Sequence, residues 1–570
     1  MEQKIMCVGV IGAGAISDIY LKNMINRFGQ LQVAAIAARH IENARKKAEQ
    51  YGIKACTVEE LLADGQIDMV VNLTPVGAHY ELIRSALLAG KHVYTEKTLT
   101  DDPEKARELL DLAEEKDLYL GCAPDTFLGA AWQTARSLID GESLGEIHSF
   151  AISANRCNDL LLSLFPFLRQ PGAGVLYDYG VYYLTALVSL LGPVARVGGI
   201  VGRPYPTHRN ILPASPDFGN IMDTPNESQV SAVVQLKNGI CGTFHIDTDS
   251  NAADRAFFAI YGTKGILYLT DPNQFGGTVK FLPNDLDFRK PQELVELWNF
   301  SQYGDNCRGI GPAEMADAIL SGRKNRASKE MACHVLEVLT AILRGGGSGA
   351  FIDILSSCDA PEPMKPKSVG IKNLGHVAFQ AKDMDAMLHF YGDILGMKRH
   401  FTLTTGDFED SLRRQNGGQI PLRDAVNMVN FYTRGLGLNK VMTLTYGDLR
   451  ETLEKSGQTD TDTLQNLALL ADRPWIDYIE AAPHQYIELF HTDGLTKKEH
   501  RDLQDVYGYQ HICLEVADIH AAWDAVIANG LKPDTPIRPG ADGACQFWLV
   551  DPDGNRLELM EYAAGGKTGA

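Results

Sequence analysis

The sequence predicts a doubly wound α/β domain, then an α+β domain with an open antiparallel sheet, then an α+β domain of two paired βαβββ modules. Three observations predict this order: strands and helices that alternate regularly at the N-terminus, closely spaced extended runs after them, and an internal repeat near the C-terminus. The 570 residues exceed what one hydrophobic core organises. The predicted domains are residues 1–125, 126–358 and 369–563, with a linker at 359–368 and a disordered tail at 564–570.

The first domain is predicted from five apolar runs that amphipathic stretches separate. The stretch 103–116, PEKARELLDLAEEK, has the spacing of apolar residues that is typical of a helix. A helix between two successive strands returns the chain to the same edge of the sheet, so the strands run parallel. The strands are expected at 4–12, 31–39, 68–74, 91–97 and 118–124.

A glycine-rich turn, Gly12-Ala13-Gly14-Ala15-Ile16-Ser17, joins the first strand to the first helix. Its glycines allow a tight turn and a close approach of the backbone to a pyrophosphate. The first N–H groups of the helix have no partner within the helix and attract the anion. The turn therefore predicts a Rossmann domain whose cofactor site includes Gly12, Gly14, Ala15 and Ile16.

The end of the second strand bears on the choice between NAD and NADP. The segment Ala37-Ala38-Arg39-His40 has no acidic residue to hold the ribose 2′-hydroxyl of NAD. The Arg39 guanidinium suits the 2′-phosphate of NADP instead, although a solvated surface arginine is the alternative. The sequence therefore predicts NAD or NADP as cofactor and favours NADP.

The second domain is predicted from extended runs at short intervals, which are typical of an open antiparallel sheet with helices on one face. The other face of such a sheet needs cover, so we expect a homodimer or a homotetramer. The strands are expected at 147–155, 231–237, 240–247, 256–262 and 265–271, and the helices at 130–138, 182–192 and 332–345.

Three motifs within residues 1–360 resemble the Gfo/Idh/MocA family of sugar and polyol dehydrogenases. They are Thr74-Pro75 with His79, then Glu96-Lys97, then the run Gly172-Ala173-Gly174-Val175-Leu176-Tyr177-Asp178-Tyr179-Gly180-Val181-Tyr182. The resemblance implies a nicotinamide-dependent oxidoreductase that acts on a CH–OH group of a carbohydrate or polyol. It also implies that Thr74, Pro75, His79, Glu96 and Lys97 bind the cofactor, and that Lys97, Asp178 and Tyr182 are catalytic, with Asp178 orienting the substrate hydroxyls.

Two positions depart from the motifs of that family. Thr98 stands where the family has proline, and Tyr182 stands where it has histidine, although some members use tyrosine there. Oxidation of a carbinol needs a base for the hydroxyl proton. A phenol has a reference pKa of about 10 and needs a nearby cation, which Lys97 supplies. Tyr183 is the competing candidate, and Asp125 and Tyr179 are lesser ones.

The third domain is predicted from an internal repeat. His376 opens the run HVAFQAKD, and His511 opens the matching run HICLEVAD; a predicted helix follows each. Each copy ends in a strand with a central glutamate, Glu488 in 486–490 and Glu558 in 556–560. A tight hairpin is expected at Asp553-Gly554. The first copy holds an insertion at 402–475, either a lid or an inert surface loop.

The repeat places four polar residues at equivalent positions: His376, Glu488, His511 and Glu558. Two imidazoles and two carboxylates suit a divalent transition metal such as Zn, Ni, Co, Mn or Fe. The domain resembles the vicinal oxygen chelate superfamily, and its donor set is similar to that of glyoxalase I rather than to that of the dioxygenases. The resemblance implies proton transfer on a substrate held by its vicinal oxygens.

Composition limits the partners and the compartment. The formal net charge of -19 argues against nucleic acid and against an anionic membrane surface. The 10 cysteines are scattered, the N-terminus lacks the pattern of a signal peptide, and no run approaches the ~20 apolar residues of a membrane span. We expect a cytoplasmic protein with a small-molecule carbohydrate or polyol substrate.

The two halves suggest one reaction sequence. Oxidation of a sugar, glycoside or polyol hydroxyl gives a ketone, which acidifies the neighbouring C–H. The metal domain then enolises the product, which leads to epimerisation, isomerisation or β-elimination. One alternative is a dehydrogenase whose C-terminal domain is a non-catalytic binding or dimerisation module. Another is a nicotinamide-sensing regulator without catalysis.

Overall fold

The computed structural model divides the chain into two compact units, Met1–Asn299 with Tyr303–Met364, and Phe300–Gln302 with Lys365–Ala570. It describes residues 5–170, 173–250, 257–284, 294–299, 301–346, 349–365, 369–380, 427, 430–445, 450–451, 474–482, 485–490, 508–539, 544–551 and 554–561. Within these ranges, the side chains at 372–380, 439, 441–445, 474–482, 485–486, 488–490 and 508–510 are not described.

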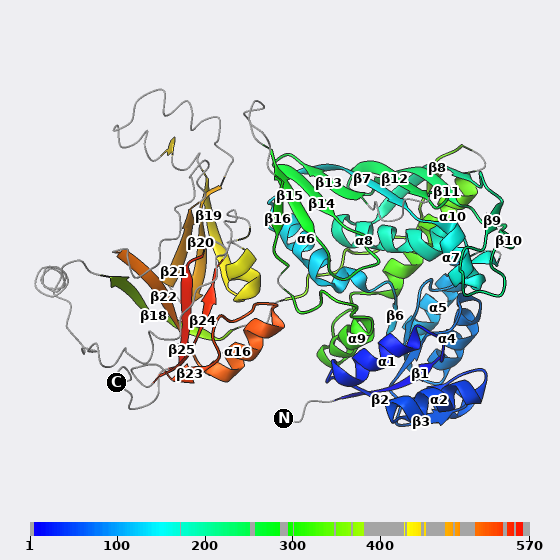
Figure 1. The fold of residues 1–570 in the computed structure, drawn as a ribbon, viewed down its shortest axis with the longest axis horizontal. Helices are drawn as coiled ribbons and strands as arrows, with labels where there is room; N and C mark the ends of the chain where they lie inside the picture. Colours follow the sequence, from blue (N-terminus) through cyan, green and yellow to red (C-terminus); the bar gives the residue numbers. More distant parts are fainter. Residues whose placement is uncertain are drawn as a thin grey trace, which may run out of the picture. The chain divides into compact units, whose positions relative to one another are not determined.

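The first unit begins with a six-stranded parallel sheet in the order β3-β2-β1-β4-β5-β6, coloured blue in Figure 1. The order reverses between β1 and β4, and ligands of such sheets bind at the carboxyl ends of the strands near that point. The predicted Rossmann fold is confirmed. The strands are β1 (Met6–Ile11), β2 (Leu31–Ala37), β3 (Lys54–Cys56), β4 (Met69–Asn72), β5 (His92–Thr95) and β6 (Leu120–Cys122).

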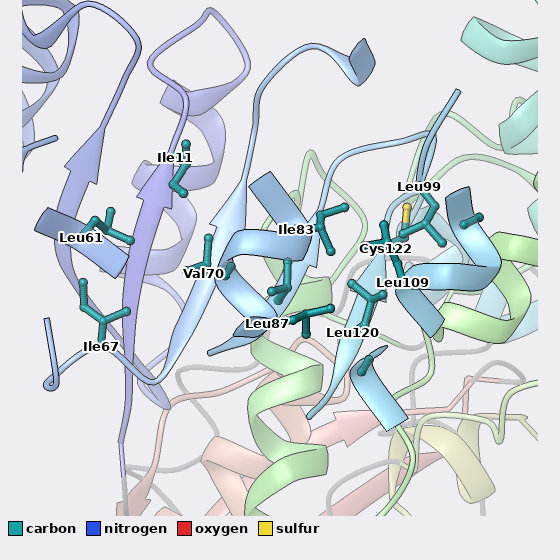
Figure 2. Close-up of a cluster of buried hydrophobic side chains, with 14 of the residues drawn as sticks. Ile11, Leu61, Ile67, Val70, Ile83, Leu87, Leu99, Leu109, Leu120 and Cys122 are labelled. Atoms are coloured by element: carbon teal, nitrogen blue, oxygen red, sulfur yellow. The ribbon is translucent and has the colours of Figure 1, made fainter. Parts of the chain in front are cut away.

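Helices cover this sheet and bury their apolar stripes against it. Figure 2 shows Val70 of β4 and Leu120 of β6 beside Ile83, Leu87 and Leu109 of the helices, all of them almost fully buried. The strands are apolar at nearly every position because helices exclude water from both faces. The helices are α1 (Ser17–Asn26), α2 (Ile41–Tyr51), α3 (Val58–Ala63), α4 (His79–Leu88) and α5 (Pro103–Glu115).

The second sheet has nine strands in the order β16-β15-β14-β13-β7-β12-β11-β8-β17. The predicted open sheet is confirmed: all its pairs are antiparallel except β7 with β12, which makes the sheet mixed. Several helices and strands lie between β7 and β12 in the sequence, and the chain enters β12 running in the same direction as β7. The strands are β7 (Ile147–Asn155), β8 (Val194–Gly202), β11 (Gln229–Leu236), β12 (Cys241–Asp247), β13 (Phe257–Gly262), β14 (Gly265–Leu269), β15 (Val279–Pro283), β16 (Val295–Leu297) and β17 (Ile352–Asp353).

Helices α6 (Ala130–Asp140), α8 (Val181–Leu191) and α10 (Lys329–Gly345) lie along one face of the nine-stranded sheet (Figure 1). Every residue of α8 is buried, which explains its nearly uninterrupted apolar sequence. A short π-helical turn, Leu176–Gly180, leads into α8 and carries Asp178. The remaining elements are α7 (Asn158–Leu164), α9 (Ile310–Ser321) and a small hairpin of β9 (Thr207–Arg209) and β10 (Ile221–Asp223).

The second unit contains a five-stranded sheet, β18-β22-β25-β24-β23, and a three-stranded sheet, β19-β20-β21. The first strands of the two repeat copies, β18 and β22, pair antiparallel. The helix of the first copy, most of the insertion and Asp553 lie outside the described residues. The elements are β18 (Ile371–Gln380), β19 (Asn439–Thr445), β20 (Pro474–Ala482), β21 (Gln485–Phe490), β22 (Gly508–Val516), α16 (Ile519–Ala528), β23 (Arg538–Pro539), β24 (Cys545–Val550) and β25 (Arg556–Glu561).

In the part of the chain that the structure describes, no helix is both long enough and apolar enough to cross a lipid bilayer.

Candidate functional site

The glycine turn between β1 and α1 leaves room for a phosphate group. Gly12 has a φ of 117°, and a Cβ there would lie 2.7 Å from the backbone of Leu73. At Gly14 an added Cβ would meet no atom within 4 Å, so the space before the helix is open. No side chain caps α1 at Ile16, although the backbone N–H groups of Ser17 and Asp18 donate to the carbonyl oxygens of Gly14 and Ala15.

Arg39 lies two residues beyond the end of β2, where an adenosine ribose would reach. Its side chain is exposed. The neighbouring Ala37 and Ala38 offer no carboxylate for a 2′-hydroxyl. The exposed position of Arg39 is compatible with both predicted alternatives, a contact with the 2′-phosphate of NADP and a solvated surface arginine.

The loops after β4 and β5 are joined by a buried histidine. His79 Nδ1 lies 2.7 Å from the carbonyl oxygen of Thr98, and Nε2 lies 2.8 Å from that of Thr74. Burial lowers the pKa of His79, and the two carbonyl oxygens only partly oppose this. Both ring nitrogens are occupied by the protein's own backbone. The histidine predicted in the cofactor site thus holds the two loops in position rather than presenting a free ring nitrogen.

Thr74, Pro75 and Glu96 also lie at the carboxyl edge of the parallel sheet. The Thr74 hydroxyl donates to the side-chain oxygen of Asn72 at 2.7 Å, and Pro75 precedes a short 3-10 turn. The carboxylate of Glu96 accepts hydrogen bonds from the hydroxyl of Tyr20 at 2.7 Å and from the backbone N–H of Lys97 at 3.1 Å. These contacts fix the segment that carries the lysine.

Lys97 and Asp178, which are 81 residues apart in the sequence, form an ion pair. Lys97 Nζ donates to Asp178 Oδ1 at 2.7 Å and to the Asp178 carbonyl oxygen at 2.9 Å. Burial lowers the pKa of Lys97, but the charge and hydrogen bond of Asp178, together with Tyr182 and Glu96, outweigh it and raise the pKa to about 12. Burial likewise opposes ionisation of Asp178, yet Lys97 and Arg156 lower its pKa overall. The pair is therefore charged at neutral pH.

Tyr182 lies beside this ion pair, and Tyr183 does not. The Lys97 ammonium group is 5.6 Å from the centre of the Tyr182 ring. The Tyr183 hydroxyl instead bonds to that of Tyr179 at 3.0 Å within the core, and Tyr183 has no exposed surface. The geometry therefore favours Tyr182 over its neighbour as the proton carrier.

A second cation, Arg308, lies near the hydroxyl of Tyr182. Its Nη2 is 3.5 Å from the Tyr182 hydroxyl and donates to Asn273 Oδ1 at 2.7 Å. The pKa of Tyr182 is raised overall, because burial outweighs the positive charges of Lys97 and Arg308, which lower it. Sequence reasoning missed Arg308 because it lies 126 residues from Tyr182; the two glycines that follow in Arg308-Gly309-Ile310-Gly311 are its only local signal.

Asp125, a lesser candidate in the sequence, supports the segment of Arg308. It is 2% exposed and accepts a hydrogen bond from the N–H of Gly311 at 2.9 Å. Burial raises its pKa to about 6. The carboxylate thus anchors the start of α9 next to the catalytic candidates.

Arg156, also missed, extends the site toward solvent. Its guanidinium is 3.7 Å from Asp178 Oδ2 and 4.3 Å from the centre of the Tyr179 ring. A small hollow of ≈ 20 Å³ that opens to solvent adjoins it, with Asn158, Asp178 and Glu227 in its wall. The hollow thus adds further polar side chains beside Asp178.

The second unit brings two of the four predicted metal ligands together. His511 Nε2 on β22 lies 3.4 Å from Glu558 Oε2 on β25. The backbone of His376 pairs with Cys513, which in turn pairs with Glu558, so three of the predicted ligand positions lie on adjacent strands. Glu488 lies on β21, and the side chains of His376 and Glu488 are outside the described residues.

The donor types at these positions fit a divalent metal, since imidazole and carboxylate are its usual ligands. Among the described side chains, no group of three histidine, cysteine or acidic residues is placed to hold an ion. The structure thus brings together the side chains of two predicted ligands, His511 and Glu558. The strand register places the backbone of His376 next to them.

Comparison with known families matches three segments of the chain. Residues 6–123 match an oxidoreductase family with an NAD-binding Rossmann fold, and residues 132–268 match the GFO/IDH/MocA C-terminal domain. Residues 373–418 and 400–559 match the glyoxalase/bleomycin resistance protein/dioxygenase superfamily. The order of the three matches is the order of domains that the sequence predicts.

Individual proteins similar to this chain match its first part. An uncharacterized oxidoreductase of Schizosaccharomyces pombe is 33% identical over 322 residues, which cover 52% of this chain and 85% of that protein. A dTDP-3,4-didehydro-2,6-dideoxy-alpha-D-glucose 3-reductase of Streptomyces violaceoruber is 33% identical over 204 residues, 34% of this chain and 57% of that protein.

A solved structure of levoglucosan dehydrogenase with NADH has the same fold. Its TM-score is 0.54 at 18% identity, and the match covers 62% of this chain and 100% of that one. The chain therefore belongs to the Gfo/Idh/MocA family of NAD(P)-dependent oxidoreductases and carries a C-terminal domain of the glyoxalase superfamily.

Proposed function

We propose that this protein oxidises a hydroxyl group of a sugar, glycoside or polyol with NAD or NADP, or catalyses the reverse reduction. The observation that carries the proposal is the charged Lys97–Asp178 pair beside the ring of Tyr182, whose hydroxyl lies near Arg308, at the carboxyl edge of the dinucleotide-binding sheet. A carbinol oxidation needs a hydride acceptor, a proton acceptor and a positive charge near the developing alkoxide.

Each group has a separate role in the proposed step. The nicotinamide, when bound, accepts the hydride from the carbinol carbon. Tyr182 takes the hydroxyl proton in its phenolate form, which the positive charges of Lys97 and Arg308 favour against burial, whereas Lys97 is protonated and has no free electron pair. The ammonium group of Lys97 stabilises the alkoxide, while Asp178 holds Lys97 and accepts a hydrogen bond from a neighbouring substrate hydroxyl.

The proposed substrate class rests on chemistry and on relatives. Polar side chains with both donors and acceptors line the hollow beside Asp178, as the hydroxyl groups of a carbohydrate require. The Streptomyces relative is named as a reductase of a sugar nucleotide, and the structurally similar dehydrogenase is named for levoglucosan. We extend that class of substrate to this chain.

The proposed second step belongs to the C-terminal domain. A keto group acidifies the C–H next to it, and a divalent metal that holds the oxygens would stabilise the enediolate. His511 and Glu558, with His376 and Glu488 proposed as the other ligands, would hold that metal, and a detached glutamate would serve as base. The competing proposal is a dehydrogenase whose C-terminal domain only binds or dimerises.

Product analysis tests both steps. The full chain is incubated with NAD+ or NADP+ and a panel of sugars, glycosides and polyols, and products are identified by mass spectrometry and NMR. We expect a keto product from the chain stripped of metal with EDTA, and an epimer, isomer or elimination product once metal is restored. Release of the same keto product under both conditions would leave the dehydrogenase and remove the second step.

A further inference from the structure

The face of the C-terminal sheet that carries His511 and Glu558 also carries two arginines and a buried indole N–H. We propose that Arg538, Arg556 and Trp548 form a binding site for an oxyanion, a carboxylate or a phosphate, on a small molecule held next to the His511–Glu558 pair. The site lies wholly in the second unit, so the inference does not depend on the proposed dehydrogenase activity.

Strand register places these residues on one face. Residues paired directly across strands share a face, as do residues two apart on one strand. His511 pairs with Arg556, and Trp548 pairs with Glu558. Arg538 on the edge strand β23 pairs with Gln546, two residues from Trp548.

Helix α16 packs against the opposite face. Phe547, which alternates with Trp548 on β24, contacts Trp523 of that helix with ring centres 5.2 Å apart. Phe547 has no exposed surface. The face with His511 is therefore the one that this helix leaves available to a ligand.

The side chains on that face are in contact. The rings of His511 and Trp548 meet edge to face with centres 4.8 Å apart. The guanidinium of Arg556 lies 4.7 Å from the centre of the Trp548 ring. Trp548 thus joins the predicted metal ligand to the arginine, so a ligand at one group reaches the other.

Two buried donors on this face have no hydrogen-bond partner in the part of the chain that the structure describes. They are Nη2 of Arg538 and Nε1 of Trp548, and Trp548 is only 7% exposed. Leaving a buried donor unsatisfied costs folding free energy, and such groups are rare outside functional sites. A bound ligand whose oxygen atoms accept hydrogen bonds from both donors would explain why they have no partner in the protein.

The charges on this face also favour an anion. Asp534 is 3.6 Å from Arg556, but its side chain is 47% exposed. Arg538 has no ion-pair partner among the described residues. A guanidinium group binds two oxygens of a carboxylate or phosphate at once, which supplies the missing charge and the missing acceptors.

Calorimetry on the full chain tests the site with three probes: D-glucuronate, glucose 6-phosphate and the uncharged methyl glucoside. We expect binding of at least one anionic probe and weaker binding of the glucoside. In Arg538→Met and Arg556→Met the dissociation constant of that probe should rise about tenfold or more. Lys532→Met, which removes an exposed charge from the same unit, is the matched control and should leave it unchanged.

Stability separates recognition from a structural role. Because Arg538 has a buried donor without a partner, Arg538→Met should keep or raise the unfolding midpoint while it weakens binding of the anionic probe. Arg538→Lys should lose less affinity for that probe. Comparison of the two anions shows whether carboxylate or phosphate is the natural group. Equal binding of the glucoside, no binding of either anion at millimolar concentration, or unchanged affinity in both arginine variants would overturn the inference.

Discussion

Tyr182 acquires its proposed role from what surrounds it rather than from its own chemistry. Its hydroxyl is buried, which disfavours the phenolate, and only the charges of Lys97 and Arg308 work in the opposite direction. A phenol in this position is a usable base only with both cations present. The sequence indicated Lys97 as one cation, but the second becomes visible only when residues 126 positions apart are brought together.

Removal of Arg308 should therefore shift the pH dependence of oxidation. In Arg308→Met one of the two charges that lower the pKa of Tyr182 is lost, so that pKa rises. The limb on which kcat/KM increases with pH should move to higher pH, and Arg308→Lys should restore part of the shift. The measurement is the pH profile of kcat/KM. A profile that keeps its position while the rate falls would assign Arg308 a purely structural role.

Asp125 allows a test of stability at the residue scale. Its pKa is raised from 3.8 to about 6, so the folded state holds the proton more tightly than the unfolded state. The free energy of unfolding should fall by about 3 kcal/mol as the pH rises through that window. Asp125→Asn keeps an acceptor for Gly311 and should raise the unfolding midpoint at pH 7 but not at pH 4.

The exposed Asp353, changed to Asn, is the control for that experiment and should have no such effect. A lower midpoint for Asp125→Asn at both pH values would mean that its ionised carboxylate stabilises the fold.

Arg39 bears on cofactor choice. If its guanidinium binds the 2′-phosphate, Arg39→Asp should weaken the binding of NADP+, because the carboxylate repels the phosphate. The same change should strengthen the binding of NAD+, because the carboxylate accepts a hydrogen bond from the ribose hydroxyl. We expect the ratio of the two dissociation constants to change by about tenfold or more. Equal affinities before and after the change would leave Arg39 as a solvated surface residue.

At the scale of elements, the turn between β1 and α1 shows how two glycines differ in purpose. Gly12 meets the backbone of Leu73 and has a positive φ, so it is required by the fold, whereas Gly14 borders open space and has no such requirement; its predicted role is to admit the cofactor. The sequence pattern marked both without separating these reasons. The sequence pattern also located β7 and β12 but did not predict that they run parallel, because their relative direction depends on the elements that connect them.

The two glycines make a matched pair of variants. Gly12→Ala should destabilise the protein by at least ~1 kcal/mol and abolish cofactor binding, because its Cβ clashes with backbone. Gly14→Ala should unfold like the wild type yet bind NAD(P) more weakly. Thermal unfolding and fluorescence titration with NADPH measure the two effects. If Gly14→Ala bound the cofactor normally, the phosphate would have to lie elsewhere.

At the scale of the whole molecule, the order of domains followed from sequence alone because each has a distinct periodicity or repeat. The site was less predictable. Lys97, Asp178 and Tyr182 carried family motifs, but His79 is occupied by two backbone carbonyls, and Arg156 and Arg308 stand in no motif. The predicted metal ligands could be identified because the repeat gives each of them a counterpart in the other copy, whereas the arginines on the same sheet face have none.

Two compact units predict two separable ligand responses in one chain. NADP+ should raise the unfolding midpoint of one transition, and EDTA should lower that of the other, since each ligand stabilises only the unit that binds it. Glu558→Gln should abolish the EDTA effect, whereas Asp524→Asn on the surface of α16 should retain it. Differential scanning calorimetry with elemental analysis for bound metal provides the readout. Wild-type protein without metal would leave the second unit as a binding module.

The most direct test of the central claim is the rate of nicotinamide reduction by Tyr182→Phe with the best substrate of the panel. Loss of the proton acceptor should lower kcat by about 10²–10⁴-fold and leave the dissociation constant of the cofactor unchanged. Tyr183→Phe, which changes a core hydroxyl, should retain most of the rate. Near wild-type turnover in Tyr182→Phe would contradict the account and move the proton transfer to another group.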